Sequence, residues 1–248
     1  MSYKNPFTLQ EKRILVTGAS SGIGRSIAQE CAAAGATVVL NGRDEQRLNE
    51  TLSSLEGSGH CAIAADLTHF DTVKQHLATL EPLDGLVLCA GVGQTAPVQN
   101  VKADKIQGVF STNTFAPVQL LQMLVKGKKI NRKASVVFIS SIARQKPYVG
   151  NGVYSASKAA LNGFSKVAAL ELAGREIRVN CIEPGLIMTS IVKDSVFDEE
   201  QLAEFKKTMP LGFGSPRHIA LGCVYLLSDA SCWTTGTSLV IDGGQTLI

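Results

Sequence analysis

A tyrosine, a lysine and a serine stand at spacings that suit proton-transfer chemistry. Lys158 follows Tyr154 by four residues, and Ser141 precedes that tyrosine by thirteen. Residues four apart share one face of a helix, so both side chains can point into the same cleft. A phenol has a reference pKa of about 10, and a nearby ammonium lowers it by favouring the phenolate. The pattern predicts a tyrosine general acid or base, beside a serine that holds a carbonyl oxygen. An ordinary amphipathic helix is the alternative for Tyr-x-x-x-Lys alone.

A glycine-rich turn near the N-terminus indicates nucleotide binding. Residues 13–16 form a short apolar run typical of a strand, and Thr-Gly-Ala-Ser-Ser-Gly-Ile-Gly follows at 17–24, before an alanine-rich segment that we expect to be helical. Glycines at such a turn let the backbone approach a pyrophosphate, and the helix N-terminus offers free N–H groups. The spacing Gly-x-x-x-Gly-x-Gly differs from the usual dinucleotide fingerprint and from a P-loop. A glycine turn without a ligand is the alternative.

Short apolar runs alternate with helical patterns along the chain. We expect strands at 14–16, 37–40, 61–64, 85–88, 135–139, 178–182 and 238–241, and helices near 23–34, 44–55, 69–79, 101–126, 152–173 and 216–228. This alternation favours an α/β fold with a doubly wound parallel sheet and helices on both faces. The segment 186–213 breaks the alternation and is predicted to be an insertion before the last helix.

Composition excludes several classes of protein. The chain has 248 residues, 45% of them hydrophobic, and this length suits one domain with a large core. A net charge of +3 with scattered basic residues gives no sign of nucleic-acid binding. No apolar run reaches membrane-spanning length, and residues 1–10 lack the layout of a signal peptide. We therefore expect a cytoplasmic protein with no nucleic-acid or membrane partner.

The cysteines and histidines do not suggest a metal site. Six cysteines lie at positions 31, 61, 89, 181, 223 and 232, and none forms a Cys-x-x-Cys pair. Several fall in apolar segments, where a free cysteine acts as a small hydrophobe. The four histidines do not cluster with carboxylates. We expect no disulfide and no bound metal.

Taken together, these motifs resemble the short-chain dehydrogenase/reductase family, and in particular its 3-oxoacyl-[acyl-carrier-protein] reductases. The resemblance covers nearly the whole chain, and it rests on the glycine motif at 17–24, Asp66, Ala90-Gly91, Asn113, Ser141, Tyr154, Lys158, Pro184-Gly185 and Asp242-Gly243-Gly244. It implies a Rossmann-like, seven-stranded, mainly parallel sheet in a single domain, 1–248. The cofactor part would span about 1–135, the catalytic part about 136–248, and a substrate lid about 186–213. It also implies a homotetramer, with a dimer as the alternative.

The resemblance implies an enzyme that interconverts a ketone and a secondary alcohol by hydride transfer. The implied catalytic residues are Asn113, Ser141, Tyr154 and Lys158, and the thirteen-residue spacing favours Ser141 over the adjacent Ser140. Lys158 would lower the pKa of the tyrosine and hold ribose hydroxyls, while Asn113 would anchor a water that relays protons. The residues implied to bind the cofactor are Gly18, Ser20, Ser21, Gly22, Ile23, Gly24, Arg43, Asp66, Leu67, Ala90, Gly91, Tyr154, Lys158, Pro184, Gly185, Ile187 and Thr189.

The residues after the second expected strand favour NADP(H) over NAD(H). NAD-preferring relatives usually carry an acidic residue where this chain has Gly42. Glycine leaves room for a 2′-phosphate, and Arg43 can pair with that phosphate in a bidentate manner. A solvated loop arginine is the alternative, and Ser21 stands where many NADP-binding relatives have a basic residue. Asp66 would contact the adenine ring or belong to the N-cap region of the next helix.

Two departures from the family pattern leave alternatives open. Cys89 replaces the asparagine that usually precedes Ala-Gly, and a thiol cannot supply an amide's hydrogen bonds. A catalytically weak NADPH-binding regulator or sensor is therefore the alternative, with a sugar-nucleotide epimerase or dehydratase disfavoured by the glycine spacing. Arg144 and Lys146 follow Ser141 closely. They could steer an anionic thioester substrate, or they could be solvated or bound to acidic residues of a neighbouring subunit.

Overall fold

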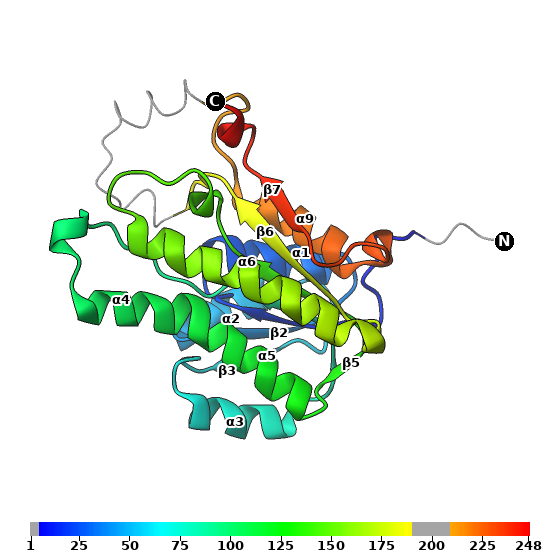
Figure 1. Cartoon of the computed structure of the whole chain (residues 1–248). Helices are drawn as coiled ribbons and strands as arrows, with labels where there is room; N and C mark the ends of the chain where they lie inside the picture. Colours follow the sequence, from blue (N-terminus) through cyan, green and yellow to red (C-terminus); the bar gives the residue numbers. More distant parts are fainter. Residues whose placement is uncertain (1–4, 190–208) are drawn as a thin grey trace.

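The computed structural model describes residues 5–189 and 209–248, in which strands and helices alternate (Figure 1). The strands are β1 (Arg13–Thr17), β2 (Thr37–Gly42), β3 (Cys61–Ala64), β4 (Leu83–Leu88), β5 (Ile130–Ile139), β6 (Arg178–Pro184) and β7 (Ser238–Ile241). The α-helices in these ranges are α1 (Gly22–Ala33), α2 (Glu45–Ser53), α3 (Phe70–Thr79), α4 (Ala103–Phe110), α5 (Ala116–Lys126), α6 (Gly152–Leu172) and α9 (Pro216–Leu227).

The strands form one seven-stranded sheet in the order β3-β2-β1-β4-β5-β6-β7, and every neighbouring pair is parallel. The predicted Rossmann-like α/β fold is thus confirmed. The chain changes direction across the sheet between β1 and β4, which are hydrogen-bonded neighbours. In open parallel sheets, ligands bind outside the carboxyl ends of the strands at such a switch point.

Side chains of the strands alternate between two cores, one on each face of the sheet. Val16, Val38 and Val87 pack in the core that contains residues of α1, α2 and α9. Leu15 and Val39, one position along the same strands, pack in the core that contains residues of α3, α5 and α6. Figure 1 shows these two helix layers, with α6, α5 and α3 in front of the sheet and α1 and α2 behind it. Burial on both faces explains why the strands are continuous apolar runs.

The predicted helix 101–126 is divided into three parts. A π-turn at Ser111–Phe115 separates α4 from α5. The apolar pattern continues through this segment, so the periodicity gives no sign of the turn. Asn113, one of the predicted catalytic residues, lies inside it. π-Bulges are rare and frequently occur at functional sites.

Strand β5 begins at Ile130, five residues before the predicted start. Asn131, Arg132 and Lys133 interrupt the apolar pattern there, yet the backbone still pairs with β4 through Leu83 and Ile130. The pairing register shifts between Leu83 and Gly85, which accommodates the irregular segment. Exposed polar side chains at the amino end of a strand are compatible with a buried continuation.

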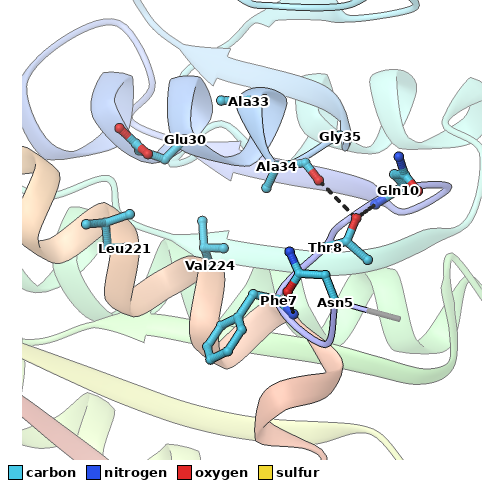
Figure 2. Close-up of a pocket in the computed structure, with 10 residues that line it drawn as sticks. All are labelled: Asn5, Phe7, Thr8, Gln10, Glu30, Ala33, Ala34, Gly35, Leu221 and Val224. Atoms are coloured by element: carbon cyan, nitrogen blue, oxygen red, sulfur yellow. Dashed lines mark hydrogen bonds between the residues drawn. The ribbon is translucent and has the colours of Figure 1, made fainter. Parts of the chain in front are cut away.

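The segment before β1 lies against the carboxyl end of α1 and against α9. Figure 2 shows the surface hollow that it borders, where Phe7 lies beside Val224 of α9 and the Thr8 hydroxyl contacts the Ala34 carbonyl at 3.4 Å. Arg217 and Glu30 join the two helices through an ion pair of 2.8 Å. None of the predicted site residues lines this hollow.

Candidate active site

The glycine turn after β1 is shaped by close backbone contacts. Gly18 has a φ of +67°, and a Cβ there would lie 2.9 Å from Cα of Ala90, which follows β4. A Cβ on Gly24 would lie 2.1 Å from the Gly18 carbonyl oxygen. Neither position can therefore accept a side chain without a backbone shift. The turn brings the carboxyl ends of β1 and β4 together.

The start of α1 fits a pyrophosphate. The helix begins at Gly22, and Ser21 at the N-cap uses no side-chain oxygen to cap it. The first N–H groups of a helix have no intrahelical partner, and the helix dipole favours an anion there. Ser20 lies in the turn and Ile23 is the second residue of α1, and their predicted contact with a pyrophosphate stays a prediction. The backbone cradle therefore matches the group that the glycine motif implies.

The loop after β4 is fixed by the hydroxyl of Thr17. This oxygen accepts hydrogen bonds from the backbone N–H groups of Cys89 (2.9 Å) and Ala90 (3.1 Å), and donates to the Val87 carbonyl at 3.3 Å. Thr17 thus holds the loop in which Cys89 replaces the usual asparagine. The Cys89 side chain packs against the apolar core, and burial raises the pKa of its thiol to about 12. It is a neutral group at physiological pH.

Gly91 brings this loop next to two predicted catalytic residues. A Cβ on Gly91 would lie 3.3 Å from both the Asn113 Oδ1 atom and the Lys158 Nζ atom. Asn113 is fully buried. Its Oδ1 atom accepts from the Val92 N–H at 2.8 Å, and its amide donates to the Val92 carbonyl (2.9 Å) and to the Ser157 hydroxyl (3.1 Å). The asparagine side chain therefore braces this loop against α6.

Tyr154, Lys158 and Ser141 meet at the carboxyl end of β5. The Lys158 ammonium lies 5.8 Å from the centre of the Tyr154 ring and donates to the Ile139 carbonyl at 2.8 Å. The Tyr154 hydroxyl shares a hydrogen bond with Ser141. Ser140 points elsewhere and bonds to Asn162 at 2.5 Å. Of the two serines, Ser141 is therefore the one in contact with Tyr154.

The expected lowering of the tyrosine pKa is wrong for this structure. Burial raises the pKa of Tyr154, and the hydrogen bond with Ser141 offsets this effect only in part. Lys158 responds in the opposite sense, since burial lowers the pKa of its ammonium from 10.5 to about 8. Desolvation disfavours the charged form of each group, and the ammonium does not overcome it at the phenol. Near pH 7 the phenol carries its proton and the lysine is mostly charged.

The predicted contacts for the adenosine end lie together beyond β2. The Arg43 guanidinium is exposed and lies 3.9 Å from a carboxylate oxygen of Asp66. Asp66 accepts two hydrogen bonds from Thr68 rather than capping α3, whose N-cap is His69. Partial burial opposes ionisation of Asp66, yet these bonds and Arg43 hold its pKa below the usual value. Leu67, the next residue, packs against the apolar core under α3.

The residues after β6 approach the glycine turn from the opposite side. A Cβ on Gly22 would lie 3.4 Å from the Thr189 methyl carbon, so Thr189 borders that turn. Pro184 ends β6, and a Cβ on Gly185 would lie 2.8 Å from Cα of Asp242. Ile187 is buried and bridges to Gly214. Residues 190–208 of the predicted lid lie outside the described residues.

Arg144 and Lys146 do not form a pair of free cations. The Arg144 Nε atom donates to the buried carboxylate of Glu183 at 2.7 Å. The Lys146 ammonium donates to the carbonyl oxygens of Gln245 (2.5 Å) and Ile248. Arg144 thus pairs with an acidic residue of its own chain rather than of a neighbouring subunit, and the steering of an anionic substrate by these two side chains stays a prediction. The sequence analysis did not identify Glu183 as a site residue. The available signal was an acidic residue inside an otherwise largely apolar strand.

Within residues 5–189 and 209–248, no helix combines the length and apolar character needed to cross a bilayer. The same ranges hold no group of three His, Cys, Asp or Glu residues suited to a metal ion.

Known proteins resemble this chain over nearly its full length. A family model described as enoyl-(acyl carrier protein) reductase matches residues 18–246. L-Xylulose reductase from Mesocricetus auratus is 34% identical over 239 residues, covering 95% of this chain and 97% of that protein. A 3-oxoacyl-[acyl-carrier-protein] reductase from Chlamydia pneumoniae is 34% identical over 246 residues, covering 96% and 98%. A solved structure from Agrobacterium tumefaciens with bound NADP has a TM-score of 0.88 and 29% identity, covering 99% and 100%.

The fold, the glycine turn and these similarities define an oxidoreductase with a nucleotide-binding Rossmann-type sheet. The chain belongs to the short-chain dehydrogenase/reductase family, whose members bind NAD(P). The sequence resemblance is confirmed at this level.

The buried ammonium of Lys158 should make stability depend on pH. Its pKa is about 8 in the folded protein and 10.5 for the free side chain, so the unfolded chain binds more protons between these values. Stability should therefore rise with pH through this window. Relative to Lys158→Met, the wild type should gain up to about 3 kcal/mol in unfolding free energy between pH 8 and 10.5. Urea unfolding at several pH values measures this difference.

Lys166→Met is the matched control, because it removes an exposed lysine of the same helix. A wild-type minus Lys158→Met difference that stays constant across the window would contradict the lowered pKa.

Proposed function

We propose that this chain is an NADP(H)-dependent reductase of a polyhydroxylated ketone, working through Ser141, Tyr154 and Lys158. The observation that carries the proposal is the grouping of these three side chains, in which Tyr154 contacts Ser141 and Lys158, and the Lys158 ammonium lies next to Gly91 in the loop after β4. The same edge of the sheet carries the glycine turn, so a bound dinucleotide and a carbonyl would meet there.

In this mechanism Tyr154 is the proton donor. The cofactor, when bound, supplies the hydride. Ser141 holds the carbonyl oxygen beside the phenol, and Tyr154 transfers its proton as negative charge develops on that oxygen. The raised pKa of Tyr154 keeps the proton in place near pH 7. The Lys158 ammonium, 5.8 Å from the ring centre, then stabilises the phenolate that remains.

Asn113 contributes by fixing the shape of the site. Its side-chain donors and acceptor are engaged by Val92 and Ser157, so a relay water would have to bond to the backbone of the π-turn. The Asn113 Oδ1 atom and the Lys158 ammonium both lie next to Gly91. Loss of this amide would release both groups from the positions that hydride transfer requires.

The preference for NADP(H) rests on the loop after β2. Arg43 is exposed and lies beside Asp66, at the edge where the adenosine would lie. A Cβ on Gly42 would lie 3.2 Å from the Ser20 side chain, so an acidic side chain at this position would crowd the glycine turn. A guanidinium next to an uncrowded loop suits a 2′-phosphate better than free ribose hydroxyls. The relative with bound NADP supports this choice.

The charges near the site favour a neutral substrate. Arg144 is paired with the Glu183 carboxylate, and Lys146 donates to backbone carbonyl oxygens, which weakens the case for an anionic thioester. L-Xylulose reductase, a similar protein, is named for a neutral sugar ketone. The similar 3-oxoacyl reductase supports a thioester as the second candidate. NADPH oxidation, followed at 340 nm with a sugar ketone series and with acetoacetyl thioesters, tests this choice. Turnover of the thioester alone would reverse it.

We also propose that the protein is a homotetramer. In α4 and α6, Ile106, Val167 and Leu170 are exposed by 41%, 52% and 79%, and Phe115 in the adjoining π-turn by 55%. Large apolar side chains on neighbouring helices favour burial against another copy of the chain.

Tyr154→Phe should abolish turnover and leave NADPH binding close to wild type, since only the hydroxyl is lost. General acid catalysis is worth roughly 10²–10⁴ in rate, and kcat should fall by at least the lower figure. Steady-state kinetics and fluorescence titration with NADPH measure the two quantities. Tyr225→Phe on α9 is the control and should keep wild-type kcat. If Tyr154→Phe retained more than about a tenth of the wild-type rate, Tyr154 would not be the proton donor.

Arg43→Ala should weaken NADPH binding far more than NADH binding. A charged contact with phosphate is worth about 1.5–3 kcal/mol, which corresponds to a loss of roughly tenfold to hundredfold in affinity. Isothermal titration with both cofactors measures the ratio. Arg47→Ala is the control, because Arg47 is also exposed and pairs with Asp44 in the first turn of α2. Equal losses for the two cofactors would show that Arg43 does not contact the phosphate.

Light scattering at micromolar concentration should give a mass near four chains of 26.3 kDa. Val167→Glu with Leu170→Glu should lower that mass, because charges on this face of α6 oppose apolar burial. A wild-type mass of one chain would refute the assembly, and a mass of two would support the dimer alternative.

A further inference from the structure

A carboxylate with no exposed surface lies at the carboxyl end of β6. Glu183 is 0% exposed and accepts hydrogen bonds from Asn162 Nδ2 (2.6 Å), Arg144 Nε (2.7 Å) and Gln145 Nε2 (3.3 Å). Acidic side chains are almost never fully buried unless they are paired. We propose that Glu183, with Arg144, is a positioning pair that holds the carbonyl-binding serine, the acid–base helix and the Pro184-Gly185 loop in register.

The three donors come from the elements that carry the proposed chemistry. Arg144 and Gln145 lie in the loop that begins at Ser141, and Glu183 directly precedes Pro184 and Gly185. The Arg144–Glu183 bond therefore connects the loop after β5 to the end of β6. The pairing of β5 with β6 fixes the positions of the strand ends. The loops beyond these ends are outside the sheet, so their orientation depends on contacts of their own.

Asn162 extends the connection to α6. It lies one helical turn after Lys158, and besides Glu183 it contacts the hydroxyls of Ser140 (2.5 Å) and Ser238 (2.8 Å). Ser140 also bonds to the Lys158 carbonyl at 3.1 Å. The Glu183 carboxylate is thus linked through the Asn162 amide to Ser140, and through the Ser140 hydroxyl to the backbone of Lys158.

A second set of contacts ties the same two loops. The Lys146 ammonium donates to the Gln245 carbonyl at 2.5 Å, and the side-chain oxygen of Gln245 accepts from the Leu186 N–H at 3.0 Å. Leu186 follows Gly185 directly. The loop after Ser141 is therefore held at two places, by Glu183 at the end of β6 and by Gln245, which in turn contacts the segment after β6. The ion pair with Glu183 is the contact nearer the serine in sequence.

The Arg144–Glu183 ion pair suits a positioning role better than a purely stabilising one. Two charges removed from water lose hydration that their attraction only partly restores, and apolar residues of similar size often replace such pairs without loss of stability. A hydrogen-bonded pair differs from an apolar contact in fixing direction as well as distance. At this place direction matters, because hydride transfer tolerates little misalignment.

The proposal rests on the proposed reductase function, and Arg144→Ala and Glu183→Gln test it. Each should lower kcat by about a hundredfold, a loss typical of a displacement near 1 Å, with KM for NADPH nearly unchanged. The isotope effect on kcat with 4-deuterated NADPH should rise, since hydride transfer would become rate-limiting.

Added guanidine should partly restore the activity of Arg144→Ala, because the Arg144 side chain is 31% exposed and its place is accessible from solvent. Arg144→Lys, which keeps the charge but not the planar donor geometry, should remain impaired.

Arg132→Ala is the matched control. Arg132 pairs with Glu176 at 3.0 Å, joining β5 to the segment before β6 at the opposite edge of the sheet, and both side chains are exposed. This variant should keep wild-type kcat and isotope effect. Urea unfolding of Arg144→Ala, Glu183→Gln and the double variant gives the coupling of the pair without any assay of activity.

The outcomes separate this proposal from the proposed function. Loss of kcat in proportion to the folded fraction, with an unchanged isotope effect and no rescue, would overturn positioning and leave a structural pair. Wild-type kcat in both folded variants would overturn it as well. If the wild type turned over no carbonyl compound, the proposed function would fail. The fluorescence of bound NADPH would then decide, since positioning requires Arg144→Ala to change its emission without a matching change in affinity.

Discussion

The parallel pairing of β1 with β4 is the constraint on which the rest of the site depends. It places the loop after β1 directly against the loop after β4, close enough that a Cβ on Gly18 would lie 2.9 Å from Cα of Ala90. The hydroxyl of Thr17 then fixes both backbone amides of the second loop. That loop continues to Gly91, next to which the Asn113 amide oxygen and the Lys158 ammonium both lie. The glycine turn and the proton-transfer groups are therefore parts of one backbone arrangement.

Two buried charges near this edge are accommodated in different ways. Lys158 has a backbone carbonyl as its partner, and burial lowers its pKa to about 8. Glu183 instead accepts bonds from three side chains, one of them a guanidinium. A group that must respond to a developing charge is better held near its titration point, whereas a group that fixes geometry is better surrounded by donors. The contrast agrees with a chemical role for Lys158 and a positioning role for Glu183.

Much of this arrangement could be predicted from the sequence because it is local. The strands are short apolar runs buried on both faces, and the glycine turn needs residues without a Cβ, so both leave clear patterns. The π-turn around Asn113 could not be predicted, because helical periodicity continues through it. The partner of Arg144 is 39 residues away, and no spacing rule connects the two. The raised pKa of Tyr154 depends on desolvation, which only the packed structure determines.

Cys89 shows how the site can depart from its family pattern and keep its shape. An asparagine there would supply two donors and an acceptor, whereas the thiol is neutral and packs against apolar neighbours. The backbone at this position is nevertheless fixed, because Thr17 accepts its N–H. The replacement changes the electrostatics of the site rather than its shape. The thiol offers no amide dipole, and burial already disfavours the charged form of Lys158. Asparagine at position 89 should therefore favour the charged form of Lys158 if its carbonyl oxygen faces the ammonium, while the fold around Gly91 stays the same.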